Sequence, residues 1–181
     1  MSLKVTFELG DRDLSYFRRI MRESRRSSRG ADEKEVISGS EALLLKVQRR
    51  EVPQFVRGRL LKLEKMIAML GDEEWNLSGA DRSRVVSALA YFNDPRDLIP
   101  DEVPGFGFLD DAVMVELVVQ ELKHDLEAYD DFCNYRRTEA GRRRGNGKAA
   151  VTREDWLEAR CRQLHARMHR RRARRSARGR L

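Results

Sequence analysis

The spacing of apolar side chains along this chain is almost entirely helical. Apolar residues recur at intervals of three and four, which is the pattern of helices that turn one face towards a core. The pattern predicts one helix after Asp11, a second after Asp32, a third from Pro53 and a fourth over about 80–92. A long fifth helix is expected over about 110–136. We therefore predict an all-α fold, a helical bundle of about five helices followed by a basic C-terminal helix.

Local signals refine these helices. Asp11 is the expected N-cap of the first helix, because a carboxylate there can accept a backbone N–H of the first turn. The sequence Ser38-Gly39-Ser40 is expected to weaken the middle of the second helix. On the fifth helix, the polar positions expected to face water are Glu116, Lys123, Glu127 and Asp130.

A short N-terminal segment has a different period. Leu3, Val5, Phe7 and Leu9 alternate with polar residues, which is the pattern of a β-strand. A single strand cannot form a sheet. The segment is therefore expected either to pair with the same segment of a second copy, which would give a homodimer, or to lie flat on the helices.

Composition limits the kind of protein this is. With 181 residues, of which 40% are hydrophobic, the chain suits one domain, or one domain with an appendage. Its most apolar stretch, 106–122, is interrupted by acids that include Asp110, Asp111 and Glu116, so we expect no transmembrane segment. No N-terminal signal segment is recognised, and two cysteines make no disulfide framework. A cytoplasmic location is predicted, with peripheral membrane association as the open alternative.

Positive charge is concentrated at the C-terminus. Ten arginines and no acid lie between Arg160 and Leu181, whereas the first 159 residues carry 27 basic and 30 acidic side chains, a net of about −3. The formal charge of +7 is thus a property of the tail. We expect a helical body over 1–137, a flexible linker over 138–151, and a basic helix and tail over 152–181, the helix giving way to the arginine run.

Prolines and carboxylates gather in one stretch, residues 91–111, which reads YFNDPRDLIPDEVPGFGFLDD. It holds three of the four prolines and six carboxylates. Asp110 and Asp111 suit the positive N-terminal end of the fifth helix, and Gly105 and Gly107 are expected to permit positive φ. These residue types favour a rigid corner between the fourth and fifth helices.

The same stretch resembles a known signature. Over about residues 84–122 it is similar to the YkvA-like bacterial family, the domain of unknown function 1232. The resemblance implies a small helical unit whose activity is not established and which is often described as membrane-associated. It implies no catalytic residues. The positions that carry it are Tyr91, Pro95, Asp97, Leu98, Ile99, Pro100, Asp101, Pro104, Gly107, Asp110 and Asp111.

The carboxylates of this stretch also allow a chemical interpretation. If the loop folds back, five of them would converge on an oxygen-rich site suited to Mg²⁺, Mn²⁺ or Ca²⁺, and two such metals would support phosphoester hydrolysis. Against this, no histidine lies in the stretch and the spacing is not that of a calcium-binding loop. Capping and metal binding both stay open, and no other cofactor is indicated. The candidate ligands are Asp94, Asp97, Asp101, Asp110 and Asp111.

The arginine-rich tail predicts an anionic partner. Arginines neutralise nucleic-acid phosphates and release counterions, which gives salt-sensitive binding with little sequence preference. Anionic lipid or an acidic protein is the alternative, because Leu157, Cys161, Leu164 and Met168 form an apolar stripe like that of a membrane-surface helix. A tail without any partner is the third interpretation. The arginines assigned to anion binding are Arg167, Arg170, Arg171, Arg172, Arg174, Arg175, Arg178 and Arg180.

Two function classes follow from these patterns. The first is a non-catalytic helical module that binds an acidic partner, with nucleic acid favoured. The second is a metal-dependent hydrolase centred on the carboxylates of residues 94–111. A zinc site is a weaker candidate: Cys161, His165 and His169 stand four residues apart on one helical face, but they lack an evident fourth ligand.

Overall fold

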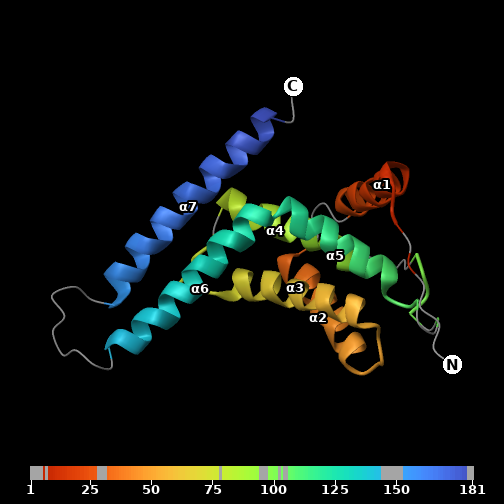
Figure 1. Cartoon of the computed structure of the whole chain (residues 1–181), viewed down its shortest axis with the longest axis horizontal. Helices are drawn as coiled ribbons and strands as arrows, with labels where there is room; N and C mark the ends of the chain where they lie inside the picture. Colours follow the sequence, from red (N-terminus) through yellow and green to blue (C-terminus); the bar gives the residue numbers. More distant parts are fainter. Residues whose placement is uncertain are drawn as a thin grey trace. The chain divides into compact units, whose positions relative to one another are not determined.

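The structure, a computed structural model, contains seven α-helices and one 3₁₀ helix within the residues it describes (Figure 1). The described residues are 6, 8–27, 32–77, 79–93, 98–101, 103, 106–143 and 153–178, with side chains left out at 139–143 and 153–156. The helices are α1 (Asp11–Ser27), α2 (Glu33–Gln48), α3 (Gln54–Gly71), α4 (Gly79–Leu89), η1 (Ala90–Asn93), α5 (Leu109–Glu121), α6 (Lys123–Arg143) and α7 (Arg153–Arg178).

The predicted all-α class is confirmed, and no strand occurs in the described part of the chain. Of the strand expected over residues 3–9, only Thr6, Glu8 and Leu9 are described, and none of the three lies in a regular element. The remaining residues of that segment, and its pairing with a second copy, lie outside the described residues.

The ends of the first two helices follow local hydrogen bonding. Gly10, not Asp11, occupies the capping position of α1: its carbonyl accepts from Leu14 N–H at 3.0 Å, and its N–H donates to the Asp13 carboxylate at 2.9 Å. The N-cap prediction was therefore wrong by one residue, because the carboxylate three positions into the helix reaches back to the cap. Asp32 caps α2 and accepts from Lys34 N–H at 3.3 Å.

The long fifth helix of the sequence interpretation is two helices, α5 and α6, separated at Leu122. Neither proline nor glycine marks the break. Two guanidinium groups bind the last carbonyls of α5 instead: Arg84 donates to the Glu121 oxygen at 3.0 Å and Arg175 to the Gln120 oxygen at 2.6 Å. Since carbonyls at a helix end need external donors, these two side chains stabilise the interruption.

The chain divides into two compact units, each with its own buried core. Unit 1 comprises residues 1–64 and 86–118, and unit 2 comprises 65–85 and 119–181. In unit 1, α1 and α2 both pack against η1, and fully buried side chains include Val56 and Phe108. In unit 2, α6 packs along α7, and Trp75 and Phe132 are buried completely.

The predicted organisation into body (1–137), linker (138–151) and basic tail (152–181) stays a prediction. Along the described chain α6 continues to Arg143, and residues 144–152 lie outside the described part. None of the described helices combines the length and the apolar character needed to cross a bilayer.

Candidate functional site

The first candidate site is the proline- and carboxylate-rich corner, which belongs to unit 1. Asp110 and Asp111 lie in the first turn of α5, as expected, and both are buried. One oxygen of the Asp110 carboxylate accepts hydrogen bonds from the backbone N–H groups of Leu98 (2.9 Å) and Ile99 (3.1 Å). This carboxylate thus holds the preceding loop against the start of α5.

Gly107 is required for a close approach between two backbone segments. A Cβ at this position would lie 2.4 Å from the Asp101 carbonyl oxygen, so no other residue fits without a shift of the loop. We expected a positive φ here, but that conformation falls on Phe108, with φ of 64°. A non-glycine residue in this region costs about 1–3 kcal/mol, which the complete burial of the Phe108 ring offsets. Gly105 lies outside the described residues.

Two basic side chains from α2 and the chain just after it bind the same corner. Lys46 Nζ lies 3.0 Å from the Asp101 carboxylate, and Arg50 donates to the Asp101 carbonyl oxygen at 2.7 Å. Gly39, expected to weaken α2, instead lets Asn93 of η1 approach, because a Cβ there would lie 2.6 Å from Asn93 Oδ1. The corner is therefore braced from α2 as well as from α5.

The five aspartates proposed as metal ligands do not form a common cluster among the residues described. Asp101 pairs with Lys46, and Asp110 binds backbone N–H groups. Asp94 and Asp97 lie outside the described residues, as do the motif prolines Pro95 and Pro104. In the described part of the chain, no three histidine, cysteine or acidic side chains come together in a way that would hold a metal ion. The divalent-cation site stays a prediction.

The second candidate site is α7, in unit 2. We expected this helix to give way to a separate arginine run, but the described chain stays helical to Arg178 and lies along α6 (Figure 1). The apolar stripe of α7 is buried, with Leu157 at 4% exposed, Cys161 at 6%, Leu164 at 1% and Met168 at 0%. Burial of four such side chains fixes the helix on its own unit.

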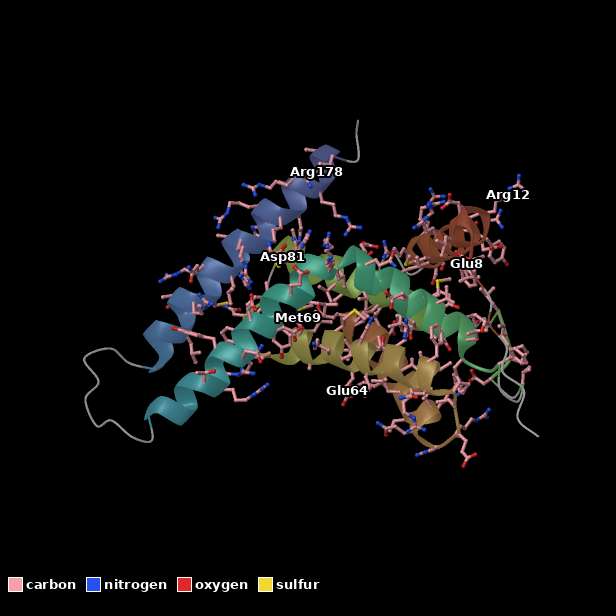
Figure 2. The ribbon with its side chains drawn as sticks, in the orientation of Figure 1. Glu8, Arg12, Glu64, Met69, Asp81 and Arg178 are labelled. Carbon is pink, nitrogen blue, oxygen red and sulfur yellow. The ribbon has the colours of Figure 1, made fainter. Side chains whose placement is uncertain are left out.

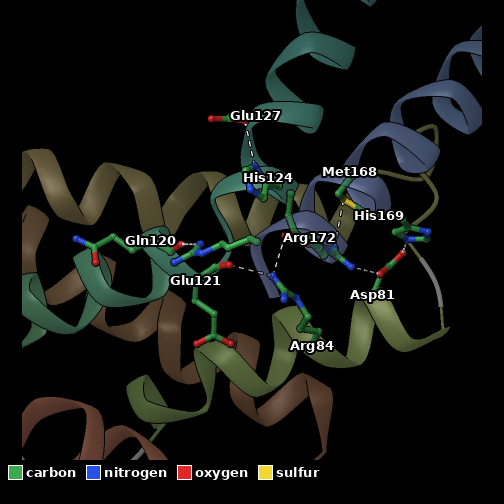
Figure 3. A network of polar contacts seen from close by, with 11 residues as sticks. Asp81, Arg84, Gln120, Glu121, His124, Glu127, Met168, His169 and Arg172 are labelled. Atoms are coloured by element: carbon green, nitrogen blue, oxygen red, sulfur yellow. Dashed lines mark hydrogen bonds and ion pairs between the residues drawn. The ribbon is translucent and has the colours of Figure 1, made fainter. Parts of the chain in front are cut away.

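One face of α7 binds acids of unit 2, as Figure 3 shows around Arg172. The Asp125 carboxylate is fully buried and forms salt bridges with Arg84, at 2.9 Å, and with Arg172. Arg172 also pairs with Asp81 at 2.5 Å, and His169 Nε2 lies 2.7 Å from the same carboxylate. Burial alone would raise the pKa of Asp81, but the hydrogen bonds from Arg172 and His169 outweigh it and hold the pKa below its usual 3.8.

The pairing continues along the helix in a regular register. Arg167 pairs with Asp131, and Arg171 lies 2.6 Å from Glu127. On each of the two antiparallel helices the paired residues are four positions apart, so they share one face of each helix. Glu127 was expected to face water; it binds an arginine because α7 covers that side of α6. Two other acids expected to face water are also paired, Glu116 with Arg59 and Lys62, and Asp130 with Lys65.

The eight arginines assigned to anion binding therefore fall into different groups. Arg167, Arg171 and Arg172 pair with acids, and Arg175 binds a backbone carbonyl oxygen. Arg180 lies outside the described residues. The remaining three are exposed and have no acidic partner among the residues described: Arg170, Arg174 and Arg178.

These three arginines form a line on the outer face of α7. They are four residues apart, so successive Cα atoms rise by about 6 Å along the helix axis. Alanines lie close to them at positions 166, 173 and 177, and all three are exposed. Figure 2 shows Arg178 close to the C-terminal end of the helix. The outer face thus presents guanidinium groups with no large apolar side chain among them.

The proposed zinc ligands each contact another group of the fold, and Cys161 Sγ also lies 3.7 Å from His165 Nε2. The Cys161 thiol donates to the Trp75 carbonyl oxygen at 2.9 Å, and burial raises its pKa to about 11, so it is a neutral thiol at neutral pH. His165 packs edge-on against the Trp75 ring, with centroids 4.3 Å apart, and burial lowers its pKa. His169 pairs with Asp81. Each of the three side chains is thus engaged by another group of the fold, and the zinc site stays a prediction.

Residues 82–117 match the family model described as protein of unknown function (DUF1232), which confirms the resemblance found over this stretch. The chain is also similar to the "uncharacterized membrane protein YkvA" of Bacillus subtilis (strain 168). The two are 29% identical over 101 residues, which cover 52% of this chain and 87% of the relative. Among solved structures, none matches the chain.

The acids that pair with α7 were not predicted from the sequence. They are Asp81, Asp125, Glu127 and Asp131. A signal for two of them was present. Glu127 and Asp131 stand four apart on one helix, and Arg167 and Arg171 stand four apart on another. Opposite charges at the same four-residue spacing indicate that these two helix faces can pair with each other. Asp81 and Asp125 gave no comparable signal, because Asp81 is the single acid of α4 and Asp125 lies outside the four-residue spacing of Glu127 and Asp131.

Proposed function

We propose that this protein is a non-catalytic helical module that binds an anionic partner through the outer face of α7, and that the partner is nucleic acid. The observation that carries the proposal is the line of Arg170, Arg174 and Arg178, which are exposed and have no acidic partner among the described residues. Arginines that are not neutralised within the chain are free to displace counterions from a phosphate backbone.

The same helix supports nucleic acid over lipid. A helix that lies in a bilayer surface needs apolar side chains that can enter the acyl region. On α7 those side chains are already buried in unit 2, with Leu164 and Met168 at 1% and 0% exposed. The outer face offers arginine and alanine, which suit a phosphate backbone, because phosphates require charge and close approach rather than apolar area.

The test measures binding of the full chain to random-sequence duplex DNA over a range of salt concentrations. Each phosphate contact contributes about 0.9 to the slope of log K against log salt. Replacing all three arginines, Arg170→Gln, Arg174→Gln and Arg178→Gln, should weaken binding and reduce that slope by roughly 2.7. Because these side chains have no partner among the described residues, the triple variant should fold as the parent does.

A matched control separates direct phosphate contact from the effect of simply lowering the net positive charge. Arg171 lies on the same helix but pairs with Glu127 at 2.6 Å, so Arg171→Gln should change the salt slope much less than any one of the three exposed arginines. A triple variant that binds DNA with the parent's affinity and slope would remove nucleic-acid binding from this face.

A second candidate is a peripheral role at a membrane surface. It is supported by the name of the Bacillus relative, which calls that protein a membrane protein. The third candidate, metal-dependent hydrolysis at the carboxylate loop, has less support, because Asp101 and Asp110 are already bound to Lys46 and to backbone N–H groups.

A further inference from the structure

Helix α1 of unit 1 is a second arginine-rich helix, and it differs from α7 in how its apolar side is covered. It carries six arginines: Arg12, Arg18, Arg19, Arg22, Arg25 and Arg26. With successive residues about 100° apart, all six fall within an arc of roughly 140°. Its large apolar side chains occupy the opposite arc. They are Leu14, Tyr16, Phe17, Ile20 and Met21.

The apolar face of α1 is only partly buried. Met21 and Ser24 are the buried residues of the helix, which packs against η1. Leu14, Phe17 and Ile20 are half-buried, and Tyr16 is 44% exposed. Unit 1 therefore leaves apolar surface of this helix accessible to another partner, with two aromatic side chains in it.

Among the residues that the structure describes, the arginine face of α1 has few acidic partners. Arg19 lies 3.9 Å from Glu23 of the same helix, and both side chains are more than half exposed, so this pair is weak. Asp13 is engaged with the Gly10 N–H. Arg12, Arg18 and Arg22 are exposed and pair with no acid among the described residues. Figure 2 shows Arg12 projecting from α1.

We propose that α1 docks on the surface of an anionic lipid bilayer. A strongly amphipathic helix with arginines on one side and aromatic and aliphatic side chains on the other is suited to the headgroup boundary. The arginines would meet lipid phosphates, while Tyr16 and the accessible parts of Phe17 and Ile20 enter the acyl boundary. Nucleic acid fits this helix less well, because it would leave the apolar surface in water. The inference rests on the second candidate function and is independent of DNA binding by α7.

The experiment is flotation of the full chain with vesicles of phosphatidylcholine alone and with vesicles that contain phosphatidylglycerol. The parent should float only with the anionic vesicles. One basic residue near such a surface contributes about fivefold in affinity, so Arg18→Gln with Arg22→Gln should weaken binding by roughly 25-fold. Tyr16→Ser should weaken it further without changing the dependence on salt.

The matched control is the pair Arg49→Gln and Arg57→Gln, two exposed arginines of unit 1 outside α1, which removes the same charge and should leave flotation unchanged. If the parent does not float at all, both membrane association and the α1 site are overturned. If it floats and the α1 variants float equally well, membrane association stands and the α1 site is overturned. Loss of duplex DNA binding, but not of flotation, in the α1 variants would also overturn it.

Discussion

Helices α1 and α7 are both rich in arginine, yet the structure uses their charges in opposite ways. On α7, Arg167, Arg171 and Arg172 pair with acids of the same unit, and the apolar stripe is buried. On α1, Arg12, Arg18 and Arg22 have no acidic partner among the described residues, and the apolar face is only half covered. Both helices keep three exposed arginines without an acidic partner among the described residues, so the difference lies in the apolar surface, which is more accessible on α1.

The difference shows that a run of arginines does not by itself indicate an external partner. Only those arginines that do not pair with acids of the same chain can indicate one. The tail of ten arginines is the strongest charge feature of the sequence, but much of it serves to dock a helix. Deletion of the whole segment from Arg170 to Leu181 would confuse the two roles, because it removes Arg172, which binds the buried Asp125. Point variants on the exposed positions separate binding from docking.

The largest expected effect comes from the buried pair on α7. Arg172→Met leaves Asp125, whose side chain is 0% exposed, with Arg84 as its remaining cation. Loss of one partner of a buried pair costs about 3–5 kcal/mol, and we expect a value near the lower end because Arg84 stays. The free energy of unfolding in urea measures it. The matched variant on α1, Arg22→Met, should lie within about 0.5 kcal/mol of the parent; equal losses from both would contradict the contrast.

The apolar faces of the two helices give the next test. Leu164→Ala on α7 removes a side chain that is 1% exposed and should cost about 3 kcal/mol, because a cavity adds to the lost burial. Leu14→Ala on α1 removes a half-buried side chain and should cost about 1 kcal/mol. Thermal unfolding of both variants, at the same pH and salt, gives the ratio of their two losses of stability. A larger loss from Leu14 would mean that α1 is seated as firmly as α7.

The smallest expected effect is a dependence of the docked helix on pH. Burial lowers the pKa of His165 from 6.5, so the folded state binds this proton less readily than the unfolded state does. Stability should therefore fall as the pH drops below 6.5. The lowered pKa of Asp81 adds a second loss of stability once the pH drops below 3.8. The unfolded chain binds a proton at this carboxylate at a higher pH than the folded chain does.

His165→Phe isolates the first of these losses. The phenyl ring keeps an aromatic contact with Trp75 and does not titrate, so the fall in unfolding free energy just below pH 6.5 should become shallower. A His165→Phe variant whose stability follows the parent's at every pH would assign the loss to another group.

The sequence predicted the helical elements well because their signals are local. Asp32 caps α2, Gly71 ends α3, and Asp110 and Asp111 begin α5, each within a few residues of the position expected. The corner between the fourth and fifth predicted helices was likewise visible in its prolines and carboxylates, and its family resemblance is confirmed. The structural role of each residue in the corner was not visible in the sequence. Gly107 allows close packing against Asp101, and Phe108 adopts the positive φ.

By itself, the chain's order of residues determined the helical class and most helix limits, since periodicity and capping act over only a few positions. Only the tertiary structure decided which charged side chains pair with one another within the chain. Arg172 meets Asp81 across 91 positions of the sequence and Asp125 across 47, and the break at Leu122 depends on guanidinium groups from two other helices. Such pairings depend on burial and on the register between helices, and neither is a local property of the sequence.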